Sequence, residues 1–470
     1  MIPVYKTGDE TDPCNYRPIS LLSVFNRLFE KLMYKRLRSY CEKNGIFFSS
    51  QYGFRDNCST QHAILDILNK IQSKIDAKLF SCGIFIDLKK AFDTVDHSIL
   101  LHKLNHYGVR GIINTWFSSY LSKRSQSTQI GSTVSNKEEI VCGVPQGSVL
   151  GPLLFLIYVN DIYRCSQIFD FYLFADDTNL LYSDKDLRDL ETVVNEELIK
   201  VGDWLDANKL SLNTSKSNFA IFHPYQHKPD CKIQLKIYSN DLKNSVPLEQ
   251  KTFVKYLGIL IDNNHSWKYH IDHISSKVSK GIGMIARLRH FVPLATTLNI
   301  YRSLIEPSIS YGLIAWGQAA NIYVNKVLIL QKRALRLMCV VDRKAHSAAL
   351  FVHSRMLPVT MLYYHLVSSM MHASHISVFF PHSEQVHHHF TRFPAVGNLH
   401  AKACRSNKLL FLFSRVSVRV CNTIPMKCHI KNRTLFKREL KNRMFKLIEI
   451  EEMNVDLRCT EICKYLSSAS

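Results

Sequence analysis

Apolar side chains recur at helical spacing in two segments near the N-terminus of this 470-residue chain. The patterns predict two amphipathic helices, one within residues 20–43 that stops before Gly45, and one within residues 59–78. We expect both apolar stripes to lie in the core, because the apolar face of a helix usually packs inward. The first stripe consists of Leu22, Phe25, Leu28, Phe29, Leu32 and Leu37, and the second of Ala63, Ile64, Ile67, Leu68, Ile71 and Ile75.

Strand patterns follow in three places. Residues 81–86 form a continuous apolar run that ends at Asp87, as expected of a buried strand. Residues 170–182 contain two apolar, aromatic-rich halves on either side of Asp176 and Asp177, which predicts a β-hairpin with both acids at its turn. Residues 216–262 alternate in polarity and predict several further strands.

The remaining apolar patterns are mainly helical. A terminal helix is predicted within residues 431–452, after a His-, Pro- and Gly-bearing loop at residues 382–403. The other predicted helices start near Asp96 or lie within residues 184–205, 265–289, 296–305 and 321–340.

Three acids are candidates for chemistry. Asp87 follows a predicted buried strand, and Asp176 and Asp177 occupy the predicted hairpin turn. If strand and hairpin pair in one sheet, the three carboxylates can converge and hold a divalent metal for phosphoryl or nucleotidyl transfer. The alternative for the Asp pair alone is a solvated turn, because Asp is a common turn residue.

A shaped loop lies between these acids. Residues 143–152 contain three glycines and two prolines, and Pro152 suits the first turn of a helix that continues into an apolar stretch. Gly147 permits close approach of a ligand to the backbone. A simple strand-to-helix connector explains Gly and Pro equally well, but it does not explain Gln146.

The order of these segments resembles the palm motifs of reverse transcriptases, and more narrowly those of non-LTR (LINE-like) retrotransposons. The palm segments are FIDLKKAFD at residues 85–93, GVPQGS at 143–148, FADD at 174–177 and LSLNTSKS at 210–217. Similar to the fingers and primer-grip motifs are NYRPISLL at residues 15–22, QYGFR at 51–55 and YLGI at 256–259.

The resemblance implies an α+β fold, a right-hand polymerase. Residues 1–262 would form fingers and palm, with an antiparallel sheet plus helices. Residues 263–375 would form a helical, thumb-like region, and residues 376–470 a C-terminal extension to which no fold is assigned. The implied function is RNA-directed DNA polymerase, a nucleotidyltransferase that adds deoxynucleotides to a primer 3′-hydroxyl on an RNA template.

The resemblance also implies a metal cofactor. Two Mg²⁺ ions would bind at Asp87, Asp176 and Asp177, with Mn²⁺ as a second candidate. These three residues are therefore the expected catalytic and metal-binding residues. Two carboxylates about 4 Å apart repel by about 4 kcal/mol at an effective dielectric of about 20, so such a site favours cations.

Five further residues acquire roles only through the resemblance. Phe92 would exclude a 2′-hydroxyl from the incoming nucleotide, and Arg55 would contact its triphosphate. Gln146 and Gly147 would line the nucleotide and template pocket, and Lys216 would assist the leaving pyrophosphate. The alternatives are a core Phe, an ordinary surface Arg and a solvated Lys.

The charge balance agrees with a protein that binds nucleic acid. The chain carries 60 Lys and Arg against 39 Asp and Glu, a formal net charge of +21. Such a field suits a phosphate backbone, although ribosomal, chromatin or membrane-surface proteins show it too. In the helix predicted at residues 321–340, a cationic face would either hold the duplex or simply be solvated. That face consists of Lys326, Lys332, Arg333 and Arg336.

The 13 cysteines form neither a disulfide nor a zinc pattern. Cys459 and Cys463 lack a second Cys/His pair at knuckle spacing, and the His387-His388-His389 run is better explained as a polar loop. No secretory signal or membrane span is predicted, so we expect an intracellular protein, with nucleus and cytoplasm not distinguished.

The first fingers motif begins within about twenty residues of Met1, whereas relatives of this family commonly carry an endonuclease upstream. The sequence thus predicts a truncated chain that depends on a separate endonuclease activity. Two other functions stay open at this point. One is an inactive, nucleic-acid-binding retroelement remnant, and the other is a maturase-like protein that assists RNA folding.

Overall fold

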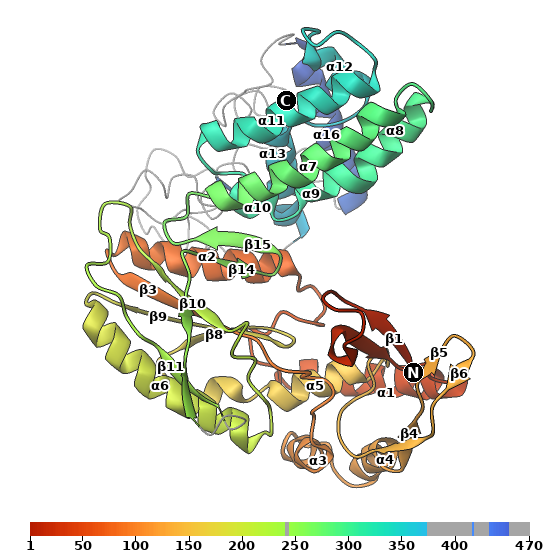
Figure 1. Cartoon of the computed structure of the whole chain (residues 1–470), viewed down its shortest axis with the longest axis vertical. Helices are drawn as coiled ribbons and strands as arrows, with labels where there is room; N and C mark the ends of the chain where they lie inside the picture. The colour runs from red at the N-terminus through yellow and green to blue at the C-terminus, as the bar shows by residue number, and fades with distance from the viewer. Residues whose placement is uncertain (240–243, 374–415, 418–431, 451–470) are drawn as a thin grey trace, which may run out of the picture. The chain divides into compact units, whose positions relative to one another are not determined.

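The computed structural model describes residues 1–239, 244–373, 416–417 and 432–450. The chain divides into two compact units, which are shown together in Figure 1. The first contains residues 1–63 and 78–254, and the second contains residues 64–77 and 255–470. The first unit therefore ends close to the predicted boundary at residue 262. The assignment of residues 64–77 to the second unit was not predicted from the sequence.

A five-stranded sheet forms the centre of the first unit, in the order β13-β10-β3-β9-β8. Every neighbouring pair is antiparallel except β10 and β13, which are parallel. The pairing of β3 with β9 confirms that the predicted strand before Asp87 and the predicted hairpin belong to one sheet. The strands are β3 (Phe80–Ile86), β8 (Asp170–Phe174), β9 (Asp177–Asp184), β10 (Asn218–Phe222) and β13 (Glu249–Gln250).

Helices bury the apolar side chains of this sheet. Helix α5 (Gly151–Val159) has Pro152 in its first turn, and nearly all of its side chains are buried. Helix α6 (Leu187–Ala207) adds Val194 and Leu198 to the same core cluster. Helix α3 (His97–His106) begins where predicted, because the Asp96 carboxylate accepts hydrogen bonds from the N–H groups of Ser98 and Ile99.

Shorter elements complete the first unit. Strands β1 (Ile2–Tyr5) and β2 (Tyr16–Ile19) form an antiparallel pair, with a 3₁₀ turn at Pro13–Asn15 between them. Helices α1 (Val24–Lys43) and α4 (Ile112–Leu121) belong to this unit too. The other strand pairs are β4 (Arg124–Gln126) with β7 (Glu138–Ile140), β5 (Gln129–Ile130) with β6 (Thr133–Val134), and β11 (Lys236–Ser239) with β12 (Asn244–Pro247).

Helix α1 forms where predicted, but the prediction that its whole apolar stripe lies in the core is wrong. Phe25 is 76% exposed, and most of the stripe faces solvent with it. The opposite face turns inward because the Glu30 carboxylate accepts hydrogen bonds from the Tyr120 hydroxyl (2.6 Å) and the Val149 N–H (2.8 Å). This fully buried carboxylate is satisfied only in that orientation.

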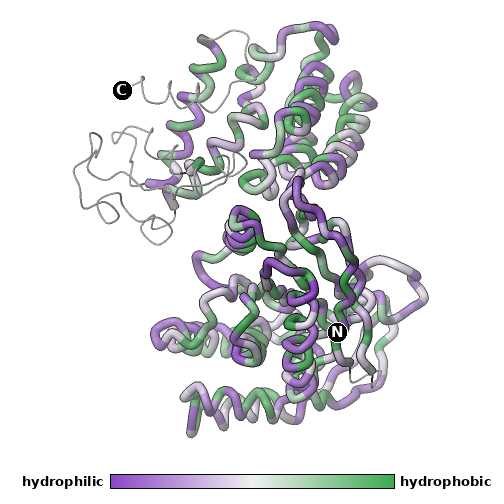
Figure 2. The backbone as a smooth tube through the Cα atoms, turned by 90° about the vertical axis from the view of Figure 1, so that its left-hand side faces the viewer, coloured by the Kyte–Doolittle hydropathy of each residue, from purple (hydrophilic) through white to green (hydrophobic). Residues whose placement is uncertain are grey.

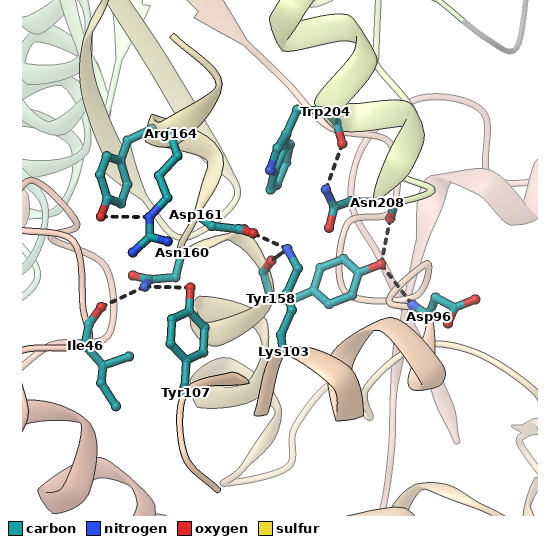
Figure 3. A network of polar contacts seen from close by, with 11 residues as sticks. Ile46, Asp96, Lys103, Tyr107, Tyr158, Asn160, Asp161, Arg164, Trp204 and Asn208 are labelled. Atoms are coloured by element: carbon teal, nitrogen blue, oxygen red, sulfur yellow. Dashed lines mark hydrogen bonds and ion pairs between the residues drawn. The ribbon is translucent and has the colours of Figure 1, made fainter. Parts of the chain in front are cut away.

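A polar network crosses the interior of the first unit (Figure 3). Lys103 on α3 is buried, and its ammonium group donates to the Tyr158 carbonyl (2.6 Å) and to the Asp161 carboxylate (2.7 Å). The same ammonium lies 4.9 Å from the centre of the Trp204 ring. Burial lowers the pKa of Lys103, and the Asp161 carboxylate counteracts that shift. The network joins α3, α5 and α6.

The second unit is mainly helical, as predicted, and its helices alternate between hydrophobic and hydrophilic residues in Figure 2. Helix α2 (Thr60–Asp76) buries Ile64, Ile67 and Ile71, which confirms the predicted stripe. Strands β14 (Phe253–Tyr256) and β15 (Ile259–Asp262) pair with each other, and the first two residues of β14 still belong to the first unit. The other helices are α7 (Lys268–Leu288), α8 (Leu294–Ile300), a π-helical segment (Tyr301–Ile305), α9 (Glu306–Ser310), α10 (Leu313–Trp316), α11 (Asn321–Met338), α12 (Ser347–His353), α13 (Val359–Ala373) and α16 (Arg433–Ile450).

The predicted helices at residues 265–289, 296–305, 321–340 and 431–452 are thus confirmed. The predicted loop at residues 382–403, the His387 run and the cysteines Cys459 and Cys463 lie outside the described residues. Throughout the described part of the chain, every cysteine is a free thiol. None of the described helices is long and apolar enough to cross a lipid bilayer.

Candidate active site in the first unit

The β8–β9 hairpin presents an acid at its tip. Phe174 pairs with Asp177, so the turn between the strands consists of Ala175 and Asp176. Ala175 has a φ of +57°, a backbone conformation that residues other than Gly adopt rarely. Such a conformation persists only where the surrounding structure enforces it.

The predicted motif at residues 51–55 supplies that support. The Gln51 side chain is buried, and its Oε1 accepts hydrogen bonds from the N–H groups of Gly53 (2.9 Å) and Ala175 (3.2 Å). The Tyr52 N–H donates to the Leu173 carbonyl (2.9 Å). The motif therefore packs directly against the turn that carries Asp176.

Gly53 lies so close to this turn that a larger residue at position 53 should disturb it. A Cβ atom at Gly53 would lie 2.4 Å from the Ala175 nitrogen and 3.0 Å from the Phe174 carbonyl carbon. Because both are backbone atoms, Gly53→Ala must displace the turn. We expect a loss of about 1–3 kcal/mol in the free energy of unfolding, measured by denaturant titration. Gly283→Ala, where no atom lies within 4 Å, is the matched control, and equal stabilities of the two variants would contradict the close packing.

Asp87 is held at the end of β3 by the segment that precedes β10. The Asn213 N–H donates to the Asp87 carbonyl (2.8 Å), and the Asn213 side-chain amide donates to Asp87 Oδ2 (2.7 Å). The Asp87 N–H donates to the Ser217 hydroxyl (3.1 Å). Backbone and carboxylate of Asp87 are thus both fixed by one segment.

Asp87 and Asp176 are close enough to influence each other electrostatically. Burial of the Asp176 carboxyl among neighbouring atoms raises its pKa, although the residue as a whole is exposed. The negative charge of Asp87 raises that pKa further, whereas the charge of Arg17 on β2 lowers it. A raised pKa means that the ionised pair is destabilised in the folded protein, so a bound cation would relieve the repulsion.

The structure does not bring the carboxylates of Asp87, Asp176 and Asp177 together as one metal-binding group. Asp177 is the first residue of β9, and within the described ranges no three His, Cys, Asp or Glu side chains form a metal-binding group. Mg²⁺ is often held by one or two carboxylates together with substrate phosphates, so Asp87 and Asp176 fit it as hard oxygen ligands. The role of Asp177 as a ligand stays a prediction.

The Gly-rich loop contacts a fourth acid, Asp93, which sequence reasoning did not select. Gln146 Nε2 donates to both carboxylate oxygens of Asp93, at 2.8 and 3.0 Å. Burial raises the pKa of Asp93, and the Gln146 hydrogen bond counteracts the shift. The Gln146 carbonyl accepts from the Ser20 N–H (2.8 Å), and Gly147, with a φ of +96°, lies beside Ser20. The loop is therefore anchored to the segment that follows β2.

The other candidates occupy separate contacts. The Phe92 ring is half-buried, stacks on Phe155 with ring centres 4.5 Å apart, and lies edge-on to Phe54. Arg55 forms an ion pair with Glu42 (3.0 Å). Arg55 therefore has a structural contact in addition to the predicted contact with the triphosphate. Lys216 is exposed on the segment between Asn213 and β10. The roles assigned to Phe92, Arg55, Gln146, Gly147 and Lys216 stay predictions.

Sequence reasoning thus missed Arg17, Asp93 and Asn213 as residues of this site. All three lie inside segments that the resemblance had singled out. Their roles depend on contacts between segments far apart in the chain, and only the motif membership could have drawn attention to them.

Comparison with known proteins identifies the family of this chain. Residues 5–261 match the family described as "Reverse transcriptase (RNA-dependent DNA polymerase)". The chain is 29% identical over 353 residues to "Probable RNA-directed DNA polymerase from transposon X-element" of Drosophila melanogaster, covering 71% of this chain and 37% of the relative. It is 28% identical over 349 residues to "RNA-directed DNA polymerase from mobile element jockey" of the same species, covering 72% and 37%. The chain therefore spans little more than a third of these relatives.

Proposed function

Because the chain belongs to the reverse transcriptase (RNA-dependent DNA polymerase) family, we propose that it polymerises DNA on an RNA template for a non-LTR retrotransposon. Its substrates would be deoxynucleoside triphosphates and a DNA primer.

The observation that supports this proposal most is the approach of two carboxylates from distant parts of the chain. Asp87 at the end of β3 and Asp176 at the hairpin turn interact electrostatically. Asn213 donates a hydrogen bond to the Asp87 carboxylate, and Gln51 holds the turn that carries Asp176 through the Ala175 N–H. A structural role alone does not explain why two negatively charged side chains that repel each other are kept close together in the folded protein.

Asp87 and Asp176 would hold two divalent cations, Mg²⁺ or Mn²⁺, with Asp177 as a further ligand. Bound there, such ions activate a hydroxyl for in-line attack and neutralise charge on triphosphate oxygens. The protein's own contribution is to hold the Asp87 carboxylate through Asn213 and the turn that carries Asp176 through Gln51. Arg17, which lowers the pKa of Asp176, favours the deprotonated form.

The neighbouring candidates would select the substrate. Phe92 would lie against the sugar and exclude a 2′-hydroxyl, and Arg55 would contact the triphosphate. Gln146 and Gly147 would line the nucleotide and template pocket, and Lys216 would assist the departing pyrophosphate. Asp93 would keep the Gln146 side chain in place, since it accepts both hydrogen bonds of that amide.

The test is extension of a DNA primer annealed to an RNA template by the purified chain, with Mg²⁺ and deoxynucleotides. We expect products that lengthen with time, and we expect primer–template binding to weaken steeply with salt, because a chain of net charge +21 releases counterions from phosphates. Binding without extension under every divalent metal would instead indicate an inactive, nucleic-acid-binding remnant.

A further inference from the structure

The segment at residues 211–217 is tied to the metal-ligand candidate Asp87 by its backbone. Leu212 and Leu88 form an isolated antiparallel bridge, and the Lys89 N–H donates to the Ser211 carbonyl (2.8 Å). The hydrogen bond from the Asn213 N–H to the Asp87 carbonyl (2.8 Å) continues this pairing. The position of Asn213 beside Asp87 therefore does not depend on the Asn213 side chain.

The hydrogen bonds of the Asn213 side chain define which end of its amide faces Asp87. The Ser215 hydroxyl donates to Asn213 Oδ1 (2.9 Å), and Asn213 Nδ2 donates to Asp87 Oδ2 (2.7 Å). An ionised carboxylate can only accept, so the nitrogen must point to Asp87. A hydrogen bond to a charged acceptor is stronger than one between neutral groups, and this one holds the Asp87 carboxylate in one orientation.

Only one oxygen of the Asp87 carboxylate is engaged in this way. Among the residues that the structure describes, Oδ1 of Asp87 has no hydrogen-bond partner, whereas Oδ2 is taken by Asn213. An Asp fixed through one oxygen presents the other to a cation without losing rotamer freedom on binding. Asn213 itself uses its amide nitrogen toward Asp87 and its amide oxygen toward Ser215.

We infer that Asn213 is a positioning residue, which orients Asp87 so that Oδ1 is presented to the catalytic cation. The inference rests on the proposed polymerase function and extends it to a residue that does not itself bind metal. Loss of an outer partner of a metal ligand typically weakens metal binding about 10–100-fold.

Mn²⁺ binding to the full chain, followed by electron paramagnetic resonance without nucleic acid, tests this role. For Asn213→Ala we expect Mn²⁺ affinity to fall about 10–100-fold, because the backbone pairing remains but the carboxylate is released. Ser215→Ala, which removes only the group that orients the amide, should cause a smaller loss in the same direction. The Ser215 variant also keeps the test decisive if Asn213→Ala does not fold.

Asn195→Ala is the matched control. Asn195 joins α6 to the Gln234 carbonyl (3.0 Å) and the Lys236 N–H (2.8 Å), so its loss also removes two side-chain hydrogen bonds, but away from the acids. It should leave Mn²⁺ affinity unchanged. Asp87→Asn removes the metal-ligand candidate itself, so Mn²⁺ binding at the proposed site should disappear in that variant.

A second readout is the Mg²⁺ concentration that gives half of the maximal extension rate. Asn213→Ala should raise it about 10–100-fold, with the rate recovering at saturating Mg²⁺. A purely structural Asn213 would lower the amount of active protein without moving this concentration. Unchanged metal affinity in an active Asn213→Ala protein overturns the inference alone. Equal Mn²⁺ affinities of the parent chain and Asp87→Asn would overturn the proposed metal site as well.

Discussion

Replacing Asp87 or Asp176 with Asn is expected to slow RNA-templated primer extension by about 10³-fold or more, which equals about 4 kcal/mol of transition-state stabilisation. Asn is nearly isosteric with Asp but carries no charge to hold a divalent cation. Primer–template affinity should remain, because phosphate binding depends on the basic surface. Single-turnover extension together with equilibrium binding measures both quantities.

The Asp176→Asn variant should also be at least as resistant to denaturation as the parent chain. The pKa of Asp176 is raised by the surrounding protein and by Asp87, so removing one charge relieves a destabilising interaction above that pKa. Asp203→Asn, which changes an exposed acid of α6, is the control and should extend primers normally. Full activity of Asp176→Asn would contradict the assignment of the site.

The second large effect is expected outside the acid site, at the ion pair between the buried Lys103 and the partly exposed Asp161 in Figure 3. Asp161→Asn should destabilise the first unit by about 3–5 kcal/mol, because it leaves the Lys103 ammonium buried without a counter-charge. Denaturant unfolding measures the loss. The deficit should shrink as the pH rises, since the variant lowers the Lys103 pKa further and the unfolded chain then binds more protons than the folded one.

Two further variants test whether the loss of stability comes from the buried charge of Lys103. Adding Lys103→Met to Asp161→Asn removes the stranded charge and should restore much of the stability. Glu249→Gln breaks an exposed pair with Lys251 (3.2 Å) and should change stability by less than about 1 kcal/mol. An equally small effect of Asp161→Asn would show that the Lys103 charge is hydrated after all.

Local signals in the sequence predicted the elements that carry the site. The Asp96 cap and the position of Pro152 in α5 each depend on a few neighbouring residues. The β8–β9 hairpin was predicted too, but with both acids at its turn, whereas Asp177 is already the first residue of β9 and Gln51, from a distant segment, holds the turn. Such signals place a carboxylate at the end of a strand or at a turn. They do not specify which side chain will approach it from elsewhere in the chain.

The missed features all depend on distant contacts. The Asn213 amide reaches Asp87 across 126 residues of sequence, and Glu30 turns α1 inward through Tyr120 and Val149. In α1 the exposed apolar residues make the usual periodic stripe, so periodicity alone selects the wrong face. A single buried carboxylate with two hydrogen bonds outweighs that pattern.

Template-directed incorporation of one nucleotide tests whether this chain polymerises DNA on RNA. The purified chain is given a primer on four RNA templates that differ only in the first unpaired base, with each deoxynucleotide in turn and Mg²⁺. We expect each template to select its complementary deoxynucleotide and Asp176→Asn to slow incorporation by about 10³-fold or more. Incorporation that ignores the template base, or that is as fast in Asp176→Asn as in the parent chain, would contradict this expectation.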